Sequence, residues 1–227
     1  AQRDSRWGLG FTAAYTFSKT IQELTPFRNH YDRALDRSIT NFDQPHIFTF
    51  SYVYELPFGR GKRFSLPAFW DKIAGGWKLS GVHNYSSGTP ISISTANALG
   101  SLIFNPGNTV DVVSNQFAGP RGPGKFDPAR DLWLNRAAFA APAPYQFGNA
   151  PRYINYRIPV RKYESMAALK EFTWSERFRL QFRAESVNPV NRVVFGGPNS
   201  NFDSGLFGRI SSAAGGRRVQ FGLKLYY

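Results

Sequence analysis

Apolar residues alternate with polar or small residues in six segments of this chain. This period of two predicts β-strands with one apolar and one polar face. It is clearest at the C-terminus, where the apolar series is Val219, Phe221, Leu223, Leu225 and Tyr227. Termini of soluble domains usually fray. A fully apolar strand face that runs to the last residue therefore favours a strand that closes an outer-membrane barrel.

The other five predicted strands span residues 5–18, 46–56, 76–85, part of 153–173, and 176–187. The third could continue past Gly88 to Ile91 and Ile93 through a β-bulge. The fourth has no clear register, and residues 161–170 can also be read as a short helix.

The strand at 176–187 gives the strongest indication of what each of its two faces contacts. Its apolar positions are Phe178, Leu180 and Phe182. The intervening positions are Arg177, Arg179, Gln181, Arg183 and Glu185. An arginine on the lipid face of a barrel costs about 2–4 kcal/mol at the membrane midplane. We therefore expect the polar face to line a water-filled lumen and the apolar face to contact lipid or a core.

The connections alternate in length along the chain. Those that follow the first, third and fifth strands are long, and those that follow the second and fourth are shorter. Long loops are uncommon inside compact soluble domains, whereas transmembrane barrels have long extracellular loops and short periplasmic turns. The pattern predicts an all-β fold, an antiparallel transmembrane β-barrel segment. A soluble or surface-attached β-sandwich binding module would satisfy the same alternation and remains the alternative.

Six strands are too few for a complete barrel, because single-chain barrels of this kind begin at about 8 strands. An open sheet in lipid would leave two edges with unsatisfied backbone groups. We therefore expect the chain to form the C-terminal part of a larger barrel.

Composition narrows the class of protein further. The chain has 227 residues, no cysteine, 21 Phe, 11 Tyr and 5 Trp. No apolar run approaches the roughly 20 residues of a membrane helix. The net charge is +13, but Lys and Arg are scattered rather than clustered, which disfavours nucleic acid as a partner. A basic lumen and loops that face anionic lipopolysaccharide explain the charge better.

No constellation of residues indicates catalysis, a cofactor or a metal. The three histidines are far apart in the sequence: His30, His46 and His83. The first long connection carries Asp32, Asp36 and Asp43, but arginines interleave with them. We therefore expect a solvated mixed-charge loop rather than a calcium cage. Neither a nucleophile elbow nor a phosphate-binding loop is present, so we expect no enzyme.

Several motifs resemble the TonB-dependent receptors of the Oar-like type, which carry a carboxypeptidase-regulatory-like domain near the N-terminus. They are NFDQPHIFTFSY (41–52), ELPFGRGK (55–62), GGWKLSG (75–81) with SGTP (87–90), FGNAPR (147–152), ERFRLQFRAE (176–185) and the closing strand. The resemblance covers most of residues 40–227 in the order of that family.

The resemblance implies a barrel of about 22 strands that is plugged by an N-terminal domain. Residues 1–227 would be the C-terminal part of the barrel domain, and the plug, TonB box and N-terminal strands would lie upstream. The implied function is outer-membrane transport of a bulky ligand, driven by the TonB complex. Expected partners are outer-membrane lipid and lipopolysaccharide, the barrel-assembly machinery, the TonB complex through the missing N-terminal region, and an unknown extracellular ligand. The terminal strand, Val219 to Tyr227, would be the assembly signal.

Overall fold

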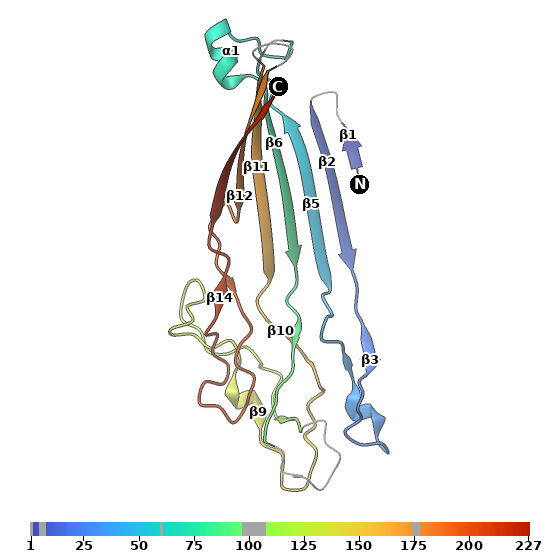
Figure 1. Cartoon of the computed structure of the whole chain (residues 1–227). Coiled ribbons are helices and arrows are strands. Elements are labelled where there is room, and N and C mark those ends of the chain that lie inside the picture. Colours follow the sequence, from blue (N-terminus) through green and yellow to red (C-terminus); the bar gives the residue numbers. More distant parts are fainter. Residues whose placement is uncertain (1, 5–7, 60, 97–107, 174–177) are drawn as a thin grey trace.

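The strands form one open antiparallel sheet, shown in Figure 1. The computed structural model describes residues 2–4, 8–59, 61–96, 108–173 and 178–227. The sheet has seven strands in the order β1-β2-β5-β6-β11-β12-β15, so β1 and β15 lie at its edges. Their bounds are β1 (Gln2–Asp4), β2 (Leu9–Phe17), β5 (His46–Glu55), β6 (Trp77–Ser86), β11 (Arg161–Thr173), β12 (Arg179–Val187) and β15 (Arg218–Tyr226).

All six predicted strands are confirmed, and the short β1 at the N-terminus adds a seventh. The longer strands have 9 to 13 residues, which suits a barrel strand of about 9–11 residues crossing a bilayer at a tilt. Residues 5–7 of the first predicted strand and Arg177 of the fifth lie outside the described residues.

The helical reading of residues 161–170 is wrong, because they belong to β11, which pairs with β6 and β12. Residues directly opposite each other share a sheet face. Lys170 is opposite Trp77 and Phe182, and Glu164 is opposite His83. β11 therefore has charged residues on the otherwise apolar face, which is why its sequence shows no clear register.

The third strand does not continue through a bulge. β6 ends at Ser86, and β7 (Pro90–Ile91) pairs instead with β10 (Ile154–Arg157) in a separate small sheet. At Gly88 the chain passes so close to the 158 backbone that an added Cβ would lie 1.8 Å from the carbonyl oxygen of Ile158. Only glycine fits there, so Gly88 marks the departure of the chain from the large sheet.

The three long connections leave the sheet at one end, and the C-terminus lies at the other end (Figure 1). They comprise residues 18–45, 87–160 and 188–217. The connection between β5 and β6, which contains α1 (Ala68–Ala74), lies at the end of the C-terminus. The predicted alternation of long and short connections is confirmed.

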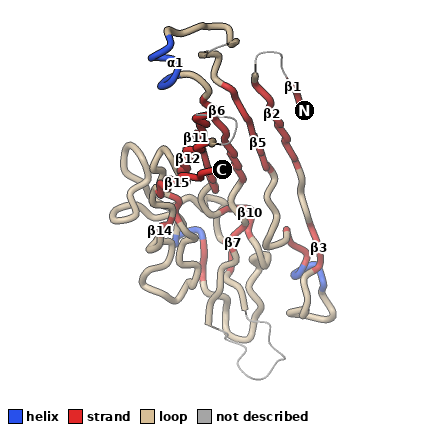
Figure 2. Tube along the Cα trace, turned by 45° about the horizontal axis from the view of Figure 1, so that its top comes forward, coloured by secondary structure: helices blue, strands red, loops and turns tan. Residues whose placement is uncertain are grey.

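The described residues of the three long connections fold together into what we call the loop subdomain (Figure 2). Its short elements are β3 (Ile21–Glu23), η1 (Arg33–Asp36), β4 (Arg37–Ile39), β7, β8 (Asp111–Val112), η3 (Arg136–Ala138), β9 (Phe139–Ala140), β10, β13 (Val194–Phe195) and β14 (Ala213–Ala214). Its buried apolar cluster is Ile91, Ile93, Val110, Leu134, Ala138, Phe139, Ala150, Ile154 and Phe207. The buried apolar core of the described residues therefore lies in the loop subdomain, at one end of the large sheet, and not on a face of that sheet.

No described part of the chain covers the apolar face of the large sheet. Phe17, Phe221 and Leu223 are 68%, 69% and 70% exposed. A β-sandwich would bury such a face against a second sheet, and the small sheets of the described residues belong to the loop subdomain instead. The sandwich alternative is therefore wrong. An extended exposed apolar surface of this kind indicates contact with a membrane or with another protein.

Candidate functional site

The polar face of the sheet is a shallow hollow. Arg179, Gln181, Arg183 and Glu185 share this face of β12, opposite Tyr226, Lys224, Gly222 and Gln220 of β15. Arg183 pairs with Glu185, and Gln181 Nε2 donates to Glu171 Oε1 at 3.0 Å. The hollow has a volume of about 490 Å³ and is lined by residues that include Gly10, Thr12, Ser51, Ser80, Ser165 and Arg183. Small polar side chains at its centre give a concave, water-compatible surface.

The apolar face carries aromatic contacts across neighbouring strands. Phe50 and Tyr52 contact each other along β5, and Trp77 contacts Phe182 across β11. Between neighbouring strands, ring centroids lie 5.9–6.4 Å apart in a series of pairs: Phe11–Phe50, Tyr52–His83, Phe48–Tyr85 and Phe182–Phe221. Such cross-strand pairs each contribute about 0.5–1.5 kcal/mol beyond area burial. The five residues predicted to form an assembly signal end this series at the sheet edge, and all are exposed: Val219, Phe221, Leu223, Leu225 and Tyr227.

Three charged residues of β11 share the apolar face, Lys162, Glu164 and Lys170, and the last two bond to polar neighbours. Glu164 Oε1 accepts a 2.6 Å hydrogen bond from the Tyr85 hydroxyl and lies 3.4 Å from Arg192 Nε. Lys170 Nζ donates to the carbonyls of Lys72 and Ile73, at 2.7 and 2.6 Å. Because all three lie toward the ends of β11, the middle of this face carries no charge among the described residues.

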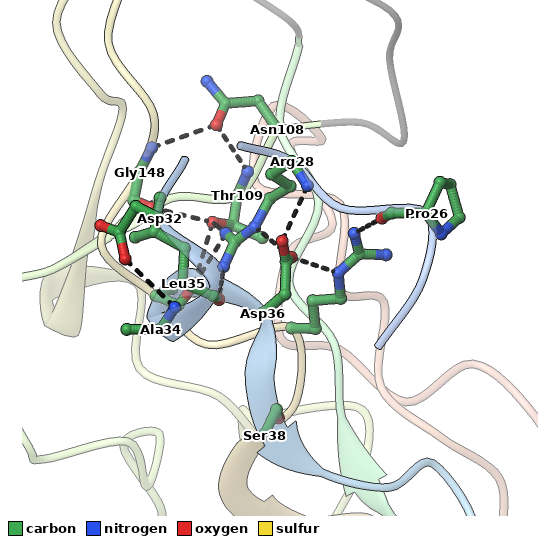
Figure 3. A network of polar contacts seen from close by, with 12 residues as sticks. Pro26, Arg28, Asp32, Ala34, Leu35, Asp36, Ser38, Asn108, Thr109 and Gly148 are labelled. Carbon is green, nitrogen blue, oxygen red and sulfur yellow. Dashed lines mark hydrogen bonds and ion pairs between the residues drawn. The ribbon is translucent and has the colours of Figure 1, made fainter. Parts of the chain in front are cut away.

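A buried ion network ties the first long connection to the second (Figure 3). Asp36 is fully buried and accepts from the Arg28 backbone N–H at 2.8 Å, Arg28 Nε at 3.0 Å and Arg152 Nε at 2.7 Å. Arg28 also donates to Thr109 Oγ1 at 2.5 Å and to the Ala150 carbonyl at 3.1 Å. Arg28 and Arg152 are thereby bonded directly to the Asp36 carboxylate, and Thr109 and Ala150 are joined to it through Arg28.

The network shifts the pKa of its members. Burial raises the pKa of the Asp36 carboxyl, but the hydrogen bonds from Arg152 and Arg28 outweigh burial and leave that pKa below its ordinary value. Burial lowers the pKa of Arg28, and the neighbouring Asp36 opposes this effect only in part. The charged pair therefore persists at neutral pH.

A second ion pair fixes the loop subdomain to the end of the sheet. Arg157 Nη2 lies 2.5 Å from Asp43 Oδ2, and its Nη1 donates to the carbonyls of Asp43 and Gly88. Asp43 Oδ1 also accepts from the Thr20 backbone N–H at 2.6 Å. Asp36 and Asp43 are thus buried structural acids, and the expectation of a solvated loop is wrong for both. Asp32 is exposed and caps η1 through the Ala34 N–H.

The third connection joins the same subdomain. The backbone N–H of Trp133 donates to the Gly208 carbonyl at 2.7 Å, and the backbone N–H of Ala96 donates to Asp203 Oδ2 at 2.5 Å. The guanidinium of Arg136 lies over the Phe202 ring and donates to the Ser204 carbonyl. The described residues of all three long connections therefore form one unit rather than independent loops.

The described residues give no site for a metal. No group of three or more His, Asp and Glu side chains is placed to hold one ion. His46 Nδ1 lies 2.7 Å from the Tyr15 hydroxyl, and His83 stacks on Tyr52. No helix in the described part of the chain is long and apolar enough to cross a membrane.

Comparison with known families identifies the class of protein. A family model described as "Outer membrane beta barrel domain" matches residues 1–220. The chain therefore belongs to the outer membrane beta barrel domain family, and its location is the bacterial outer membrane. No curated protein and no solved structure matches the chain. The predicted barrel fold and outer-membrane location are confirmed.

Proposed function

We propose that this chain is the C-terminal barrel segment of a TonB-dependent outer-membrane transporter of the Oar-like type. The observation that carries the proposal is the open sheet, which in the described residues has seven strands and two unpaired edges, β1 and β15. Backbone groups at an open edge cannot be satisfied in lipid, and barrels of a single chain have at least about 8 strands. Further strands, paired to β1 and β15, complete the wall.

The positions of the resembling motifs support the proposal. Residues 41–52 lead into and form the first part of β5, 55–62 follow its end, 75–81 open β6, and 176–185 lie mostly in β12. The motifs thus occupy several strands of one sheet and the turns at their ends. The agreement of motif order with sheet order favours a shared architecture over scattered short matches.

Each surface then has a role in transport. The aromatic face holds the wall in lipid, and the hollowed polar face lines the lumen, where its arginines meet a plug contributed from upstream. The loop subdomain forms the extracellular platform that meets the ligand, and its basic charge suits lipopolysaccharide phosphates. Transport is powered by the TonB complex, and the segment itself performs no catalysis.

The terminal strand is the proposed signal for the barrel-assembly machinery. Its apolar residues, Val219 to Leu225, lie at an open edge and are exposed. Replacing Tyr227 by Ser, or deleting residues 219–227, is expected to lower the amount of protein in the outer membrane. Equal outer-membrane levels of the variants and the parent protein would refute this role.

Fractionated cells test the transporter assignment. After formaldehyde crosslinking, the outer-membrane fraction is blotted with an antibody against a peptide from residues 108–151, before and after precipitation with an antibody against TonB. A TonB-linked species several times larger than 25.6 kDa is expected. A 25.6 kDa outer-membrane species that does not crosslink to TonB would contradict the assignment and would indicate a small barrel that works without TonB.

A further inference from the structure

The short helix α1 (Ala68–Ala74) has an apolar face that nothing in the described chain covers. Phe69, Trp70 and Ile73 are 67%, 57% and 51% exposed, and no residue of the helix is buried. At 3.6 residues per turn these three side chains fall within roughly 100° of arc. Asp71 and Lys72 lie on the opposite side. The helix is amphipathic, but its apolar side does not face a protein core.

The C-terminal end of α1 is fixed to the lipid-facing side of the sheet. The Ile73 carbonyl accepts from Trp77 Nε1 at 2.9 Å and from Lys170 Nζ at 2.6 Å, and the Lys72 carbonyl accepts from Lys170 Nζ at 2.7 Å. The Lys170 ammonium also lies 5.5 Å from the Trp77 ring and 4.9 Å from the Phe172 ring.

Lys170 explains how the helix is held there. Its side chain is on the apolar face, opposite Trp77 and Phe182, yet the residue is only 2% exposed. A cation on that face needs acceptors, and the free carbonyls at a helix C-terminus, the negative end of the helix dipole, supply them. The helix therefore sits against the lipid-facing wall at the end of the sheet opposite the loop subdomain.

We propose that α1 is an interfacial anchor that lies in the phospholipid leaflet on the periplasmic side of the outer membrane. Phe69, Trp70 and Ile73 insert among the acyl chains, continuing the lipid-covered face of the sheet. Short helices with aromatic residues on one face and charge on the other occupy this depth. Arg63 and Lys72, in the same connection, complement phosphate headgroups, whereas Lys62 pairs with Glu55 at 2.7 Å. Lys170 is the tether.

Single-cysteine labelling tests this anchor, because the chain contains no cysteine. Ile73→Cys and the matched control Lys72→Cys are made in the full chain and spin-labelled after reconstitution in vesicles of phosphatidylethanolamine and phosphatidylglycerol. The label at 73 is expected to be more accessible to oxygen than to a water-soluble nickel chelate, and the label at 72 the reverse. Ala74→Cys, at the edge of the apolar face, replaces Ile73→Cys if that variant does not insert.

Two outcomes would overturn the proposal. Equal nickel accessibility at both positions would place α1 in water. Exclusion of both probes from position 73 would mean that protein covers the apolar face instead. Adding Lys170→Met to Ile73→Cys is expected to raise nickel accessibility and label mobility at 73, because the tether is lost. An unchanged label in this variant would refute the role of Lys170.

Discussion

Replacing Asp36 by Ala tests the network that joins the loop subdomain. Asp36 is fully buried, and its carboxylate accepts three hydrogen bonds from Arg28 and Arg152. Removing one partner of a buried pair costs about 3–5 kcal/mol, because the other charge is left without compensation. The Arg28 side chain is 1% exposed, but that of Arg152 is 16% exposed and water can solvate it. We therefore expect the lower end of this range, about 3 kcal/mol.

Hydrogen exchange measures that cost locally. A loss of about 3 kcal/mol raises the population of the open form by roughly a hundredfold. Amides of Arg28, Thr109 and Ala150 should exchange faster by that factor, while strand amides keep their protection, because local opening does not unfold the sheet. The matched control is Asp32→Asn in the same loop, since asparagine caps η1 as well as aspartate does. Unchanged exchange in Asp36→Ala would refute the account of the network.

Three further perturbations follow from the same structure. Leu223→Arg, on the exposed apolar face, should destabilise the protein in vesicles by about 2–4 kcal/mol in urea unfolding. Gly222→Arg, on the other face, should cost at most about 1 kcal/mol, because its Cβ meets open space and only the like charge of Arg183 opposite opposes it; equal effects would contradict the assignment of faces. Hydrogen bonds from the Gly122 and Asp127 N–H groups and from Arg130 lower the pKa of Asp131 to about 2. That pKa lies below the ordinary value, so the stability that Asp131 contributes is present above about pH 4 and is lost as the pH falls toward 2. Proteolysis of residues 119–131 should therefore accelerate as the pH falls from 4 to 2, and titration of Asp131 should cause no change between pH 5 and 8. Gly148→Ala should open the loop subdomain to proteases, because its Cβ would lie 1.9 Å from the Thr109 carbonyl oxygen, and Gly216→Ala, with nothing nearby, should not.

Strand positions could be predicted from the sequence because period two is a local signal. Phe178 to Glu185 alternate strictly, and β12 falls there. The register of β11 was not clear from the sequence, because the charged residues Glu164 and Lys170 occupy positions on the apolar face. Their partners, Tyr85 and the α1 carbonyls, supply the hydrogen bonds that stabilise them there. Those partners are 79 and 98 residues away, so no local pattern contains them.

The loop subdomain could not be predicted for a related reason. Its core consists of isolated apolar residues such as Val110, Leu134 and Phe207, which follow no period. Asp36 pairs with the nearby Arg28, but its second arginine, Arg152, lies 116 residues further along the chain. The arginine that pairs with Asp43, Arg157, lies 114 residues away, so the burial of both acids could not be predicted from the local sequence. The mixed charge of the loop was visible in the sequence, but the burial that makes it structural was not.

Water accessibility of the two sheet faces tests the central claim most directly. Neighbouring positions of β12 are replaced singly, as Phe182→Cys and Arg183→Cys, in the cysteine-free chain. Outer-membrane vesicles are then treated with a membrane-impermeant maleimide. We expect Cys replacing Arg183, on the polar face, to be labelled faster than Cys replacing Phe182, which should be labelled only after denaturation. Labelling at 182 that equals or exceeds labelling at 183 would contradict a wall with its aromatic face in lipid.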